Sequence, residues 1–188
     1  MPVIKGKEYS QRNLPHLMPE RAIFFVTFNL KGAVPKSALI DLCEGRKRFV
    51  DYDALLHAAP IHWLRDPLLA TTVYDRMNSL EKYVHDMHAF TVMSNHVHAM
   101  FSIREESSLS EVMQIVKGGT SRRCNQLLGR SGEFWQEERY DRVIRRNEFW
   151  RVLWYILNNP VKAGIVERWQ DYPFTYLNDA LYPGLRLQ

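Results

Sequence analysis

The alternation of apolar and polar positions divides the chain into strands and helices. Residues 23–30, IFFVTFNL, are a dense run of β-branched and aromatic side chains, which predicts a buried central strand. Residues 87–93 and 96–103 are two further apolar runs separated by a short polar turn, which predicts a β-hairpin. Residues 134–144 are typical of an edge strand or an extended connection.

Apolar positions three and four residues apart predict helices over residues 37–49, 67–85, 108–128 and 147–158. Ser108 opens a capping box. The pair Gly118 and Gly119 is expected to break or kink the third helix, and Pro160 is expected to end the fourth. Residues 52–63 have no clear periodicity and are assigned to neither class.

The resulting order, β, α, β, β, α, β, α, predicts an α+β ferredoxin-like sandwich, in which an antiparallel sheet carries helices on one face. We expect an N-terminal arm over residues 1–22, one domain over residues 23–166 and a C-terminal tail over residues 167–188. The tail is expected to pack back on the domain.

Composition is that of an ordinary globular protein. The chain has 188 residues, of which 46% are hydrophobic and 24% charged, and this is enough for one domain with a real core. Cys43 and Cys124 fit no metal-binding or redox motif. No apolar stretch has the length of a membrane span, and the first residues lack the apolar core of a signal peptide. We therefore expect a cytoplasmic protein without membrane contact.

Positive charge is concentrated in one window. The net charge is +4, and residues 117–151 hold nine basic and five acidic residues, so this window accounts for the whole excess. Arginine dominates the window and is suited to bidentate phosphate contacts. The pattern favours a nucleic-acid surface, with a solvated arginine-rich face as the alternative. The candidate DNA-binding residues are Lys117, Arg122, Arg123, Arg142, Arg145 and Arg146.

The second strand of the hairpin carries the first candidate for chemistry, His96-Val97-His98. Successive side chains of a strand point to opposite faces, so His96 and His98 share one face while Val97 takes the other. Two imidazoles at this spacing can grip one divalent metal ion. Taken alone, the motif leaves open an ordinary structural role for each histidine.

The last predicted helix carries the second candidate. Its apolar stripe includes Phe149, Leu153 and Ile156, and Tyr155 lies outside that stripe. Asn159, one helical turn later, lies on the same flank as Tyr155. A phenol and a carboxamide therefore project together, although a boundary tyrosine and a helix-terminal asparagine explain the periodicity as well.

Short segments along nearly the whole chain match one family in order. They are NLPH at 13–16, FVTF at 25–28, WLRDP at 63–67, MSNHVH at 93–98, GEFWQ at 132–136, YDRVIR at 140–145 and YILNNPVKAG at 155–164. With these segments the chain resembles the REP-associated tyrosine transposases, within the HUH superfamily of single-tyrosine transposases. The family usually has proline where this chain has Ser94, but this position lies in the turn and removes no ligand.

The resemblance implies a ferredoxin-like fold and a DNA-cleaving, strand-transferring activity. It implies that His96 and His98 bind a metal, that Tyr155 is the nucleophile and that Asn159 is the third ligand. The metal would be Mg²⁺ or Mn²⁺, and a mixed imidazole and carboxamide set suits Mn²⁺ better. A tyrosine hydroxyl, with a pKa of about 10, needs a nearby cation or base to react. Attack would leave a 5′-phosphotyrosyl bond and a free 3′-OH.

The expected partner is single-stranded DNA next to a hairpin, bound by a monomer acting in cis or by a homodimer acting in trans. Tyr140 is a rival nucleophile, and His85 and His88 are weaker metal candidates. The tryptophans are expected to pack in the core or at its rim.

Two other functions compete with transposition. One is a catalytically idle single-stranded nucleic-acid-binding protein on the same fold, against which the intact Tyr155, His96 and His98 argue. The other is a small metal-dependent oxygenase or hydrolase that uses the two histidines. The arginine-rich window argues against it, as does the absence of a further ligand at a fitting sequence spacing.

Overall fold

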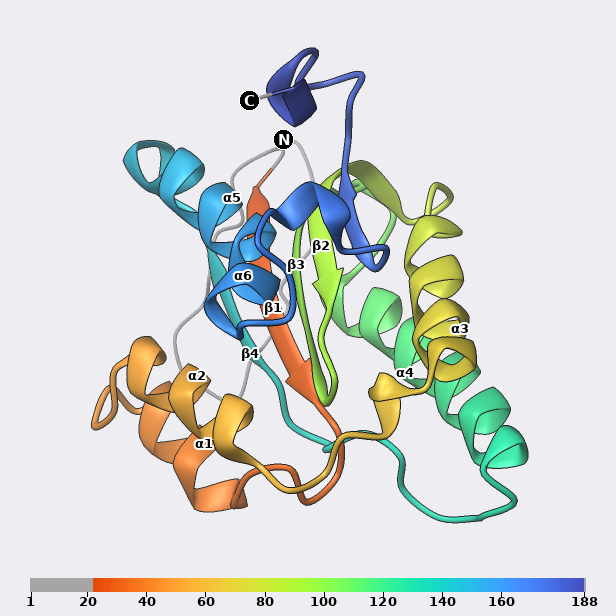
Figure 1. The fold of residues 1–188 in the computed structure, drawn as a ribbon. Helices are drawn as coiled ribbons and strands as arrows, with labels where there is room; N and C mark the ends of the chain where they lie inside the picture. Colours follow the sequence, from red (N-terminus) through yellow and green to blue (C-terminus); the bar gives the residue numbers. More distant parts are fainter. Residues whose placement is uncertain (1–21, 188) are drawn as a thin grey trace, which may run out of the picture.

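The structure, a computed structural model, describes residues 22–187. Its centre is a five-stranded sheet in the order β4-β1-β3-β2-β5, in which all neighbouring strands are antiparallel (Figure 1). The strands are β1 (Ile23–Asn29), β2 (Val84–Val92), β3 (His96–Ile103), β4 (Tyr140–Val143) and β5 (Thr175–Leu177). The predicted α+β class with an antiparallel sheet is confirmed. The predicted N-terminal arm lies, except for Ala22, outside the described residues.

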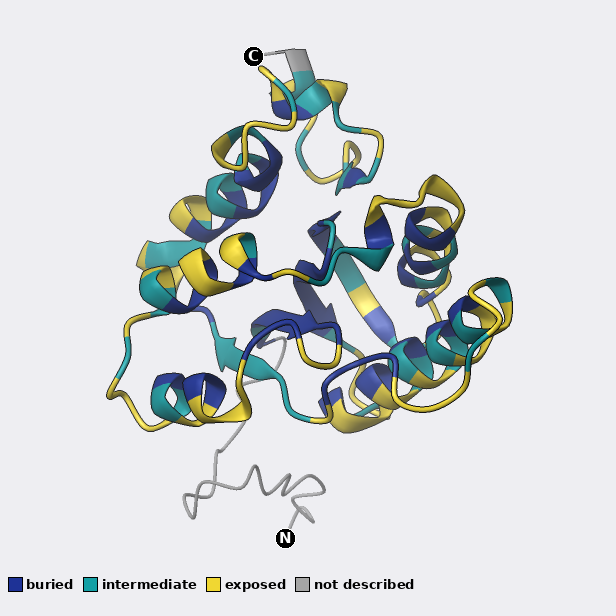
Figure 2. Ribbon diagram, turned by 60° about the horizontal axis from the view of Figure 1, so that its bottom comes forward, coloured by how far each residue is buried: buried dark blue, intermediate teal, exposed yellow. Residues whose placement is uncertain are grey.

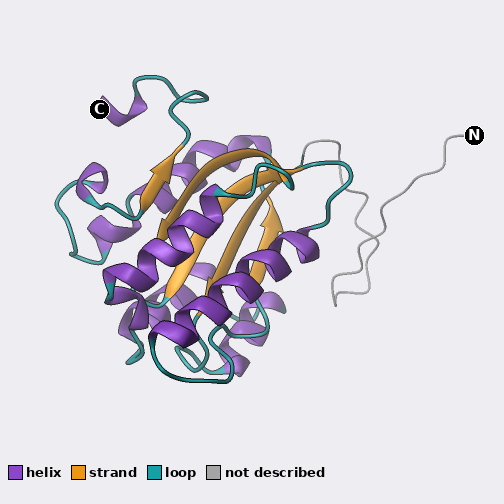
Figure 3. Ribbon diagram, turned by 90° about the vertical axis from the view of Figure 1, so that its right-hand side faces the viewer, coloured by secondary structure: helices purple, strands orange, loops and turns teal. Residues whose placement is uncertain are grey.

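The helices are α1 (Lys36–Cys43), α2 (Phe49–Ala58), α3 (Pro67–Asn78), α4 (Leu109–Leu127), α5 (Phe149–Leu157) and α6 (Asn159–Lys162). Within the ferredoxin-like β-α-β-β-α-β core, α3 and α4 lie side by side on one face of the sheet. Helix α5, which follows that core in the chain, packs on the other face (Figure 3). The prediction of helices on one face of the sheet therefore holds for the two core helices, α3 and α4. The whole domain has helices on both faces of the sheet.

The reason is that both faces of the sheet are apolar. In β1, Phe24 joins the larger core under α3 and α4, whereas its neighbour Phe25 joins a smaller core under α5. Strand β3 repeats this alternation, with Val97 in the larger core and His96 and His98 on the α5 face. These strand residues are buried, and most exposed positions lie on the outer surfaces of the helices and in the loops (Figure 2).

The glycine pair does not break the helix, so the first of the two effects predicted for it is excluded. Helix α4 runs unbroken from Leu109 to Leu127 through Gly118 and Gly119. Gly119 lies where the side chain of Arg76 from α3 crosses α4, and a Cβ there would be 2.6 Å from the arginine Nη2. The glycine thus leaves room for a neighbouring side chain instead of stopping the helix.

Three other boundaries differ from the prediction. Residues 49–58, only partly assigned from sequence, form α2. Helix α3 ends at Asn78 because β2 already begins at Val84, where it pairs with Ile103. Pro160 lies in the first turn of α6, where its missing N–H costs no hydrogen bond, and α5 ends before it at Leu157.

The C-terminal segment packs on the domain. Strand β5 pairs with the edge of β2, and Trp169 is buried against the smaller core. Trp150 lies at the rim of the core, where its ring packs on Phe149 and Tyr182 while 55% of its surface is exposed. Among residues 22–187, no helix combines the length and apolar character needed to cross a bilayer.

Two adjacent leucines at the start of α3 test this core. Leu69 is 1% exposed and Leu68 is 56% exposed. We expect Leu69→Ala to lower the free energy of unfolding by about 2–5 kcal/mol, because it leaves a cavity. Leu68→Ala is the matched control and should change it by less than about 0.5 kcal/mol. Urea denaturation measures both, and equal losses would contradict the described packing.

Candidate active site and metal centre

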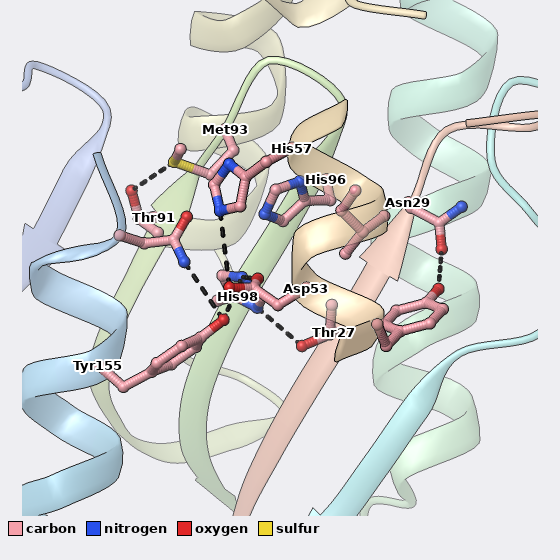
Figure 4. A network of polar contacts seen from close by, with 12 residues as sticks. Thr27, Asn29, Asp53, His57, Thr91, Met93, His96, His98 and Tyr155 are labelled. Carbon is pink, nitrogen blue, oxygen red and sulfur yellow. Dashed lines mark hydrogen bonds and ion pairs between the residues drawn. The ribbon is translucent and has the colours of Figure 1, made fainter. Parts of the chain in front are cut away.

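A buried polar cluster lies between the α5 face of the sheet and helix α2. It contains His96 and His98 from β3, Asp53 and His57 from α2, and Tyr155 from α5 (Figure 4). Phe25, Phe49 and the ring of Tyr155 surround it with apolar surface. The two predicted histidines and the predicted tyrosine are thus brought together by the fold.

His98 is completely buried and is held from both ring nitrogens. Its Nδ1 lies 2.8 Å from Thr27 Oγ1 on the neighbouring strand β1. Its Nε2 faces the centre of the cluster, 3.2 Å from Asp53 Oδ1 and 3.3 Å from the Tyr155 hydroxyl. Burial is the main cause that lowers the pKa of His98, which keeps its ring neutral at pH 7 and able to act as a ligand.

His96 is oriented by the residue before it. The side-chain amide of Asn95 donates to the Leu56 carbonyl at 2.8 Å, so the Asn95 oxygen is turned toward His96. His96 Nδ1 lies 2.6 Å from that oxygen and must carry the proton. The lone pair is then on Nε2, which is buried and has no hydrogen-bond partner among the described residues. Burial, followed by the neighbouring His98, holds the pKa of His96 well below its usual range.

Asp53 was missed by the sequence reasoning. It comes from α2, a segment without clear periodicity, and only 5% of its surface is exposed. It forms a cluster with His96 and His98, in which each residue offers one ligand atom and these atoms all lie within 4.8 Å of one another. This spacing suits a single metal ion. The i, i+4 pair of Asp53 and His57 on α2 was the available signal, since it places two ligand types on one helix face.

The charge of Asp53 is maintained by its neighbours. Burial alone raises the pKa of this carboxyl, but the imidazoles of His57 and His98, 3.6 and 3.2 Å away, outweigh it and hold the pKa well below its usual range. The carboxylate is therefore ionised in a nearly closed site. A buried negative charge of this kind is a strong ligand for a divalent cation.

Tyr155 and Asn159 occupy the same flank, as predicted. The Asn159 amide donates to the Tyr155 hydroxyl at 3.3 Å, and its Oδ1 is buried without a partner in the described part of the chain. The ammonium of Lys162 lies 4.3 Å from the centroid of the Tyr155 ring. Burial, followed by the charge of Asp53, raises the pKa of Tyr155, so the phenol is protonated at pH 7.

Tyr140 is on the same face of the sheet but farther from the ligand atoms. Its ring packs on Phe25 and Phe49, with centroids 6.2 and 5.1 Å apart. The Tyr155 hydroxyl, in contrast, reaches His98 Nε2 directly at 3.3 Å. The weaker metal candidates also lie elsewhere, since the exposed His85 pairs with Asp86 and His88 bonds the Tyr182 hydroxyl.

The six candidate DNA-binding residues divide into two groups. Lys117 donates to the backbone carbonyls of Gln136 and Glu137 at 2.7 and 2.9 Å, and burial lowers its pKa to about 8. Arg142 pairs with Glu148 at 2.9 Å. Both side chains have partners within the protein, so a contact of Lys117 or Arg142 with DNA would compete with these bonds. The other four are exposed and carry no side-chain partner among the described residues: Arg122, Arg123, Arg145 and Arg146.

The donor set fits a divalent metal ion. His96 Nε2 and Asn159 Oδ1 are buried atoms that lack a partner, and Asp53 adds a carboxylate. Two imidazole nitrogens with two oxygens suit Mn²⁺ better than Mg²⁺, which prefers oxygen ligands alone. The sequence argument against an oxygenase or hydrolase relied on the absence of a further ligand, and Asp53 removes that part of it.

A comparison with known proteins assigns the chain to a protein family. The family model described as "Transposase IS200 like" matches residues 63–159, just over half of the chain. The chain therefore belongs to the family of IS200-like transposases, and the resemblance to tyrosine transposases is confirmed at this level. No curated protein sequence gave a match.

One solved structure shares this fold. The structure of a REP-associated tyrosine transposase bound to a REP hairpin has a TM-score of 0.58 and 18% identity, and covers 92% of this chain and 87% of that one. At this identity the likeness shows a shared fold. The crystal structure of a candidate transposase from Deinococcus radiodurans is 12% identical, with a TM-score of 0.39, and covers 81% of this chain and 98% of that one.

Asp53 provides a test of the metal centre. We expect Asp53→Asn to weaken Mn²⁺ binding by more than about tenfold, because loss of even an outer partner of a metal ligand costs about 10- to 100-fold. The double substitution His96→Ala, His98→Ala should abolish binding. Isothermal titration calorimetry measures both.

Asp51→Asn is the matched control, since Asp51 is on the same helix but is exposed and pairs with Arg48. It should bind Mn²⁺ like the wild type. Wild-type affinity in Asp53→Asn would exclude the carboxylate from the ligand set.

Proposed function

We propose that this protein is a DNA transposase that cleaves and rejoins single-stranded DNA next to a hairpin, with Tyr155 as the nucleophile. The observation that carries the proposal is the position of the Tyr155 hydroxyl, 3.3 Å from His98 Nε2, inside a cluster suited to a metal ion. A phenol so close to the ligand atoms can reach a phosphate held at the same point.

The chain's own residues supply nucleophile, orientation and a route for the proton. Asn159 holds the Tyr155 hydroxyl at 3.3 Å and fixes its direction. The phenol proton leaves toward His57, whose imidazole is 3.6 Å from the Asp53 carboxylate beside the phenol, and Asp53 keeps its charge as a metal ligand. The phenol oxygen then bonds to phosphorus, the P–O3′ bond breaks, and the leaving oxygen takes up a proton to become a 3′-OH.

The resulting 5′-phosphotyrosyl bond keeps the energy of the broken phosphodiester. A second 3′-OH can therefore attack it and restore the tyrosine, so that cleavage and strand transfer are one reaction in two directions. Because Tyr155 reaches the histidines of its own chain, we infer that this chemistry runs in cis.

The metal would be held by His96, His98 and Asp53, with Asn159 Oδ1 as a further ligand. When bound, a divalent ion polarises the scissile phosphate and neutralises charge in the transition state. Its charge would also offset that of Asp53, which otherwise disfavours the phenolate.

Substrate preference follows from how closed the site is. Phe49 of α2 packs against the Tyr155 ring at 5.5 Å, so the phosphate must enter a narrow space that a paired strand does not fit. Exposed Arg145 and Arg146 precede α5 and can hold the backbone of a single strand beside it. The REP-associated transposase with the same fold is bound to a hairpin, which supports a hairpin-bearing substrate here.

A catalytically idle binding protein is the alternative, and Tyr155→Phe distinguishes the two. This change removes one oxygen and keeps the ring, so metal and DNA binding should persist. With a labelled single-stranded oligonucleotide and Mn²⁺, the wild type should form a covalent adduct in a denaturing gel, and Tyr155→Phe should form none.

Tyr140→Phe is the control and should form the adduct as the wild type does. An adduct that persists in Tyr155→Phe but disappears in Tyr140→Phe would overturn the assignment. Cleavage without any adduct would instead indicate a nuclease that uses water. If the wild type neither cleaves nor links to DNA, the idle binding protein is the better description.

Binding should also depend steeply on salt. We expect the affinity for a hairpin with a single-stranded flank to fall strongly between about 50 and 200 mM salt, because each phosphate contact releases counterions. Fluorescence anisotropy at several salt concentrations measures this. Equal affinity for a blunt duplex without a hairpin or single strand would contradict the proposed substrate.

A further inference from the structure

The chemistry proposed for Tyr155 leaves one neighbouring charge, that of Lys162, without a role. Lys162 is the last residue of α6, the short helix that follows α5 (Figure 1). Its Nζ is 4.3 Å from the centroid of the Tyr155 ring. Within residues 22–187, Lys162 forms no ion pair and its side chain donates no hydrogen bond, so the described part of the chain leaves this charge without an acidic partner.

The backbone at Lys162 is firmly held, although its side chain is exposed. Asn159 and Pro160, in the first turn of α6, are both buried. The Lys162 N–H donates to the Asn158 carbonyl at 3.0 Å, and Gly164, with a φ of +68°, ends the turn. The fold therefore fixes the root of this lysine beside the phenol ring and leaves its ammonium in contact with solvent.

The other rings around Tyr155 lie toward the sheet and α2. The ring centroids of Phe25, Phe49 and His98 are 6.0, 5.5 and 5.2 Å from that of Tyr155. Phe25 and His98 are buried strand residues, whereas Lys162 is exposed. The side of the ring that carries Lys162 is thus a side from which an anion in solution can approach the phenol.

The charge of Lys162 also reaches the ligand atoms. Burial is the largest cause that lowers the pKa of His98, and the charge of Lys162 acts in the same direction. A second positive charge near a metal centre repels the metal ion, so the metal centre gains nothing from this lysine. An anion placed between the two cations is attracted by both. A phosphodiester that is to bond to Tyr155 is such an anion.

We propose that Lys162 binds the scissile phosphate and stabilises the negative charge that builds up on it as Tyr155 attacks. The phenol oxygen is one ring radius and one C–O bond from the ring centroid, and a phosphate oxygen lies two further bonds away. The long and flexible lysine side chain can therefore donate to a non-bridging oxygen of that phosphate.

Lys162 keeps its proton throughout, and the bonds that form and break are those already given for Tyr155. Its task is electrostatic, because a donor aimed at the place where charge develops lowers the barrier of the chemical step. This inference rests on the proposed function, since it takes Tyr155 to attack a phosphodiester.

Single-turnover formation of the covalent adduct tests the role of Lys162. With Mn²⁺, a labelled hairpin oligonucleotide and saturating protein, Lys162→Gln should form the adduct on the order of 100-fold more slowly than the wild type, because one donor to the developing charge is lost. Affinity for the oligonucleotide should fall only several-fold, since other phosphate contacts remain. Lys162→Arg keeps the positive charge and should be clearly faster than Lys162→Gln.

Lys82→Gln is the matched control. It removes the same charge from an exposed lysine just before β2, at the end of the β2–β3 hairpin opposite His96. Its rate of adduct formation should equal that of the wild type. Mn²⁺ binding to Lys162→Gln, measured by calorimetry, should be at least as tight as in the wild type, because the lost charge repels the cation.

A methylphosphonate at the cleavage position separates a phosphate contact from a structural role. The methyl group replaces one non-bridging oxygen and removes the negative charge of the phosphodiester. If Lys162 acts on that charge, the ratio of the wild-type rate to the Lys162→Gln rate should shrink toward one on this substrate. A lysine that only supports the Tyr155 ring would leave the ratio as large as on ordinary DNA.

The outcomes separate this inference from the proposed function. If the wild type forms the adduct and Lys162→Gln forms it at the same rate, Lys162 does not act on the phosphate, although the proposed function stands. Equal losses in Lys162→Arg and Lys162→Gln, an unchanged ratio on the methylphosphonate, or weaker Mn²⁺ binding by Lys162→Gln would each overturn the inference, because the lysine would then be structural. If the wild type forms no adduct, the proposed function is refuted and this inference with it.

Discussion

The alternation of side chains along β3 is the constraint on which both the fold and the site depend. Val97 fills the core under α3 and α4, while His96 and His98 face α2 and α5. A slip of one residue in the pairing with β1 would exchange the two sets, burying imidazoles in the larger core. The same register also places Thr27 opposite His98, where it fixes the imidazole. The same strand register therefore determines both the packing of the sheet and the geometry of the site.

The site is polar, charged and buried, and this has a cost in stability. A carboxylate away from water needs compensation, and in the described residues Asp53 has only imidazoles and a phenol around it. Both His96 and His98 are kept neutral by burial, so they supply hydrogen bonds but no full positive charge. The buried carboxylate lacks a full positive charge beside it, and a bound cation would supply one. Unfavourable burial of this kind is typical of functional sites.

Some residues of the buried polar cluster lie inside the segment that the IS200-like family model matches, and one lies outside it. His96, His98, Tyr155 and Asn159 lie within the segment 63–159 that the IS200-like family model matches. Asp53 lies before it, in the α1–α2 hairpin, which also places Phe49 over the Tyr155 ring. This hairpin both completes the cluster of potential ligand atoms and packs against the proposed nucleophile.

The sequence by itself determined the local features: the central strand, the β-hairpin, the shared face of His96 and His98, and the common flank of Tyr155 and Asn159. These follow from backbone periods of 2 and 3.6 residues, which act between near neighbours. Only the tertiary structure decided that Asp53 joins His98 across 45 positions and that Lys117 donates to backbone carbonyls of a distant segment. It also decided that Gly119 makes room for Arg76. Such contacts join elements that are distant in the chain, and no local pattern of residues records which helix will pack against which face.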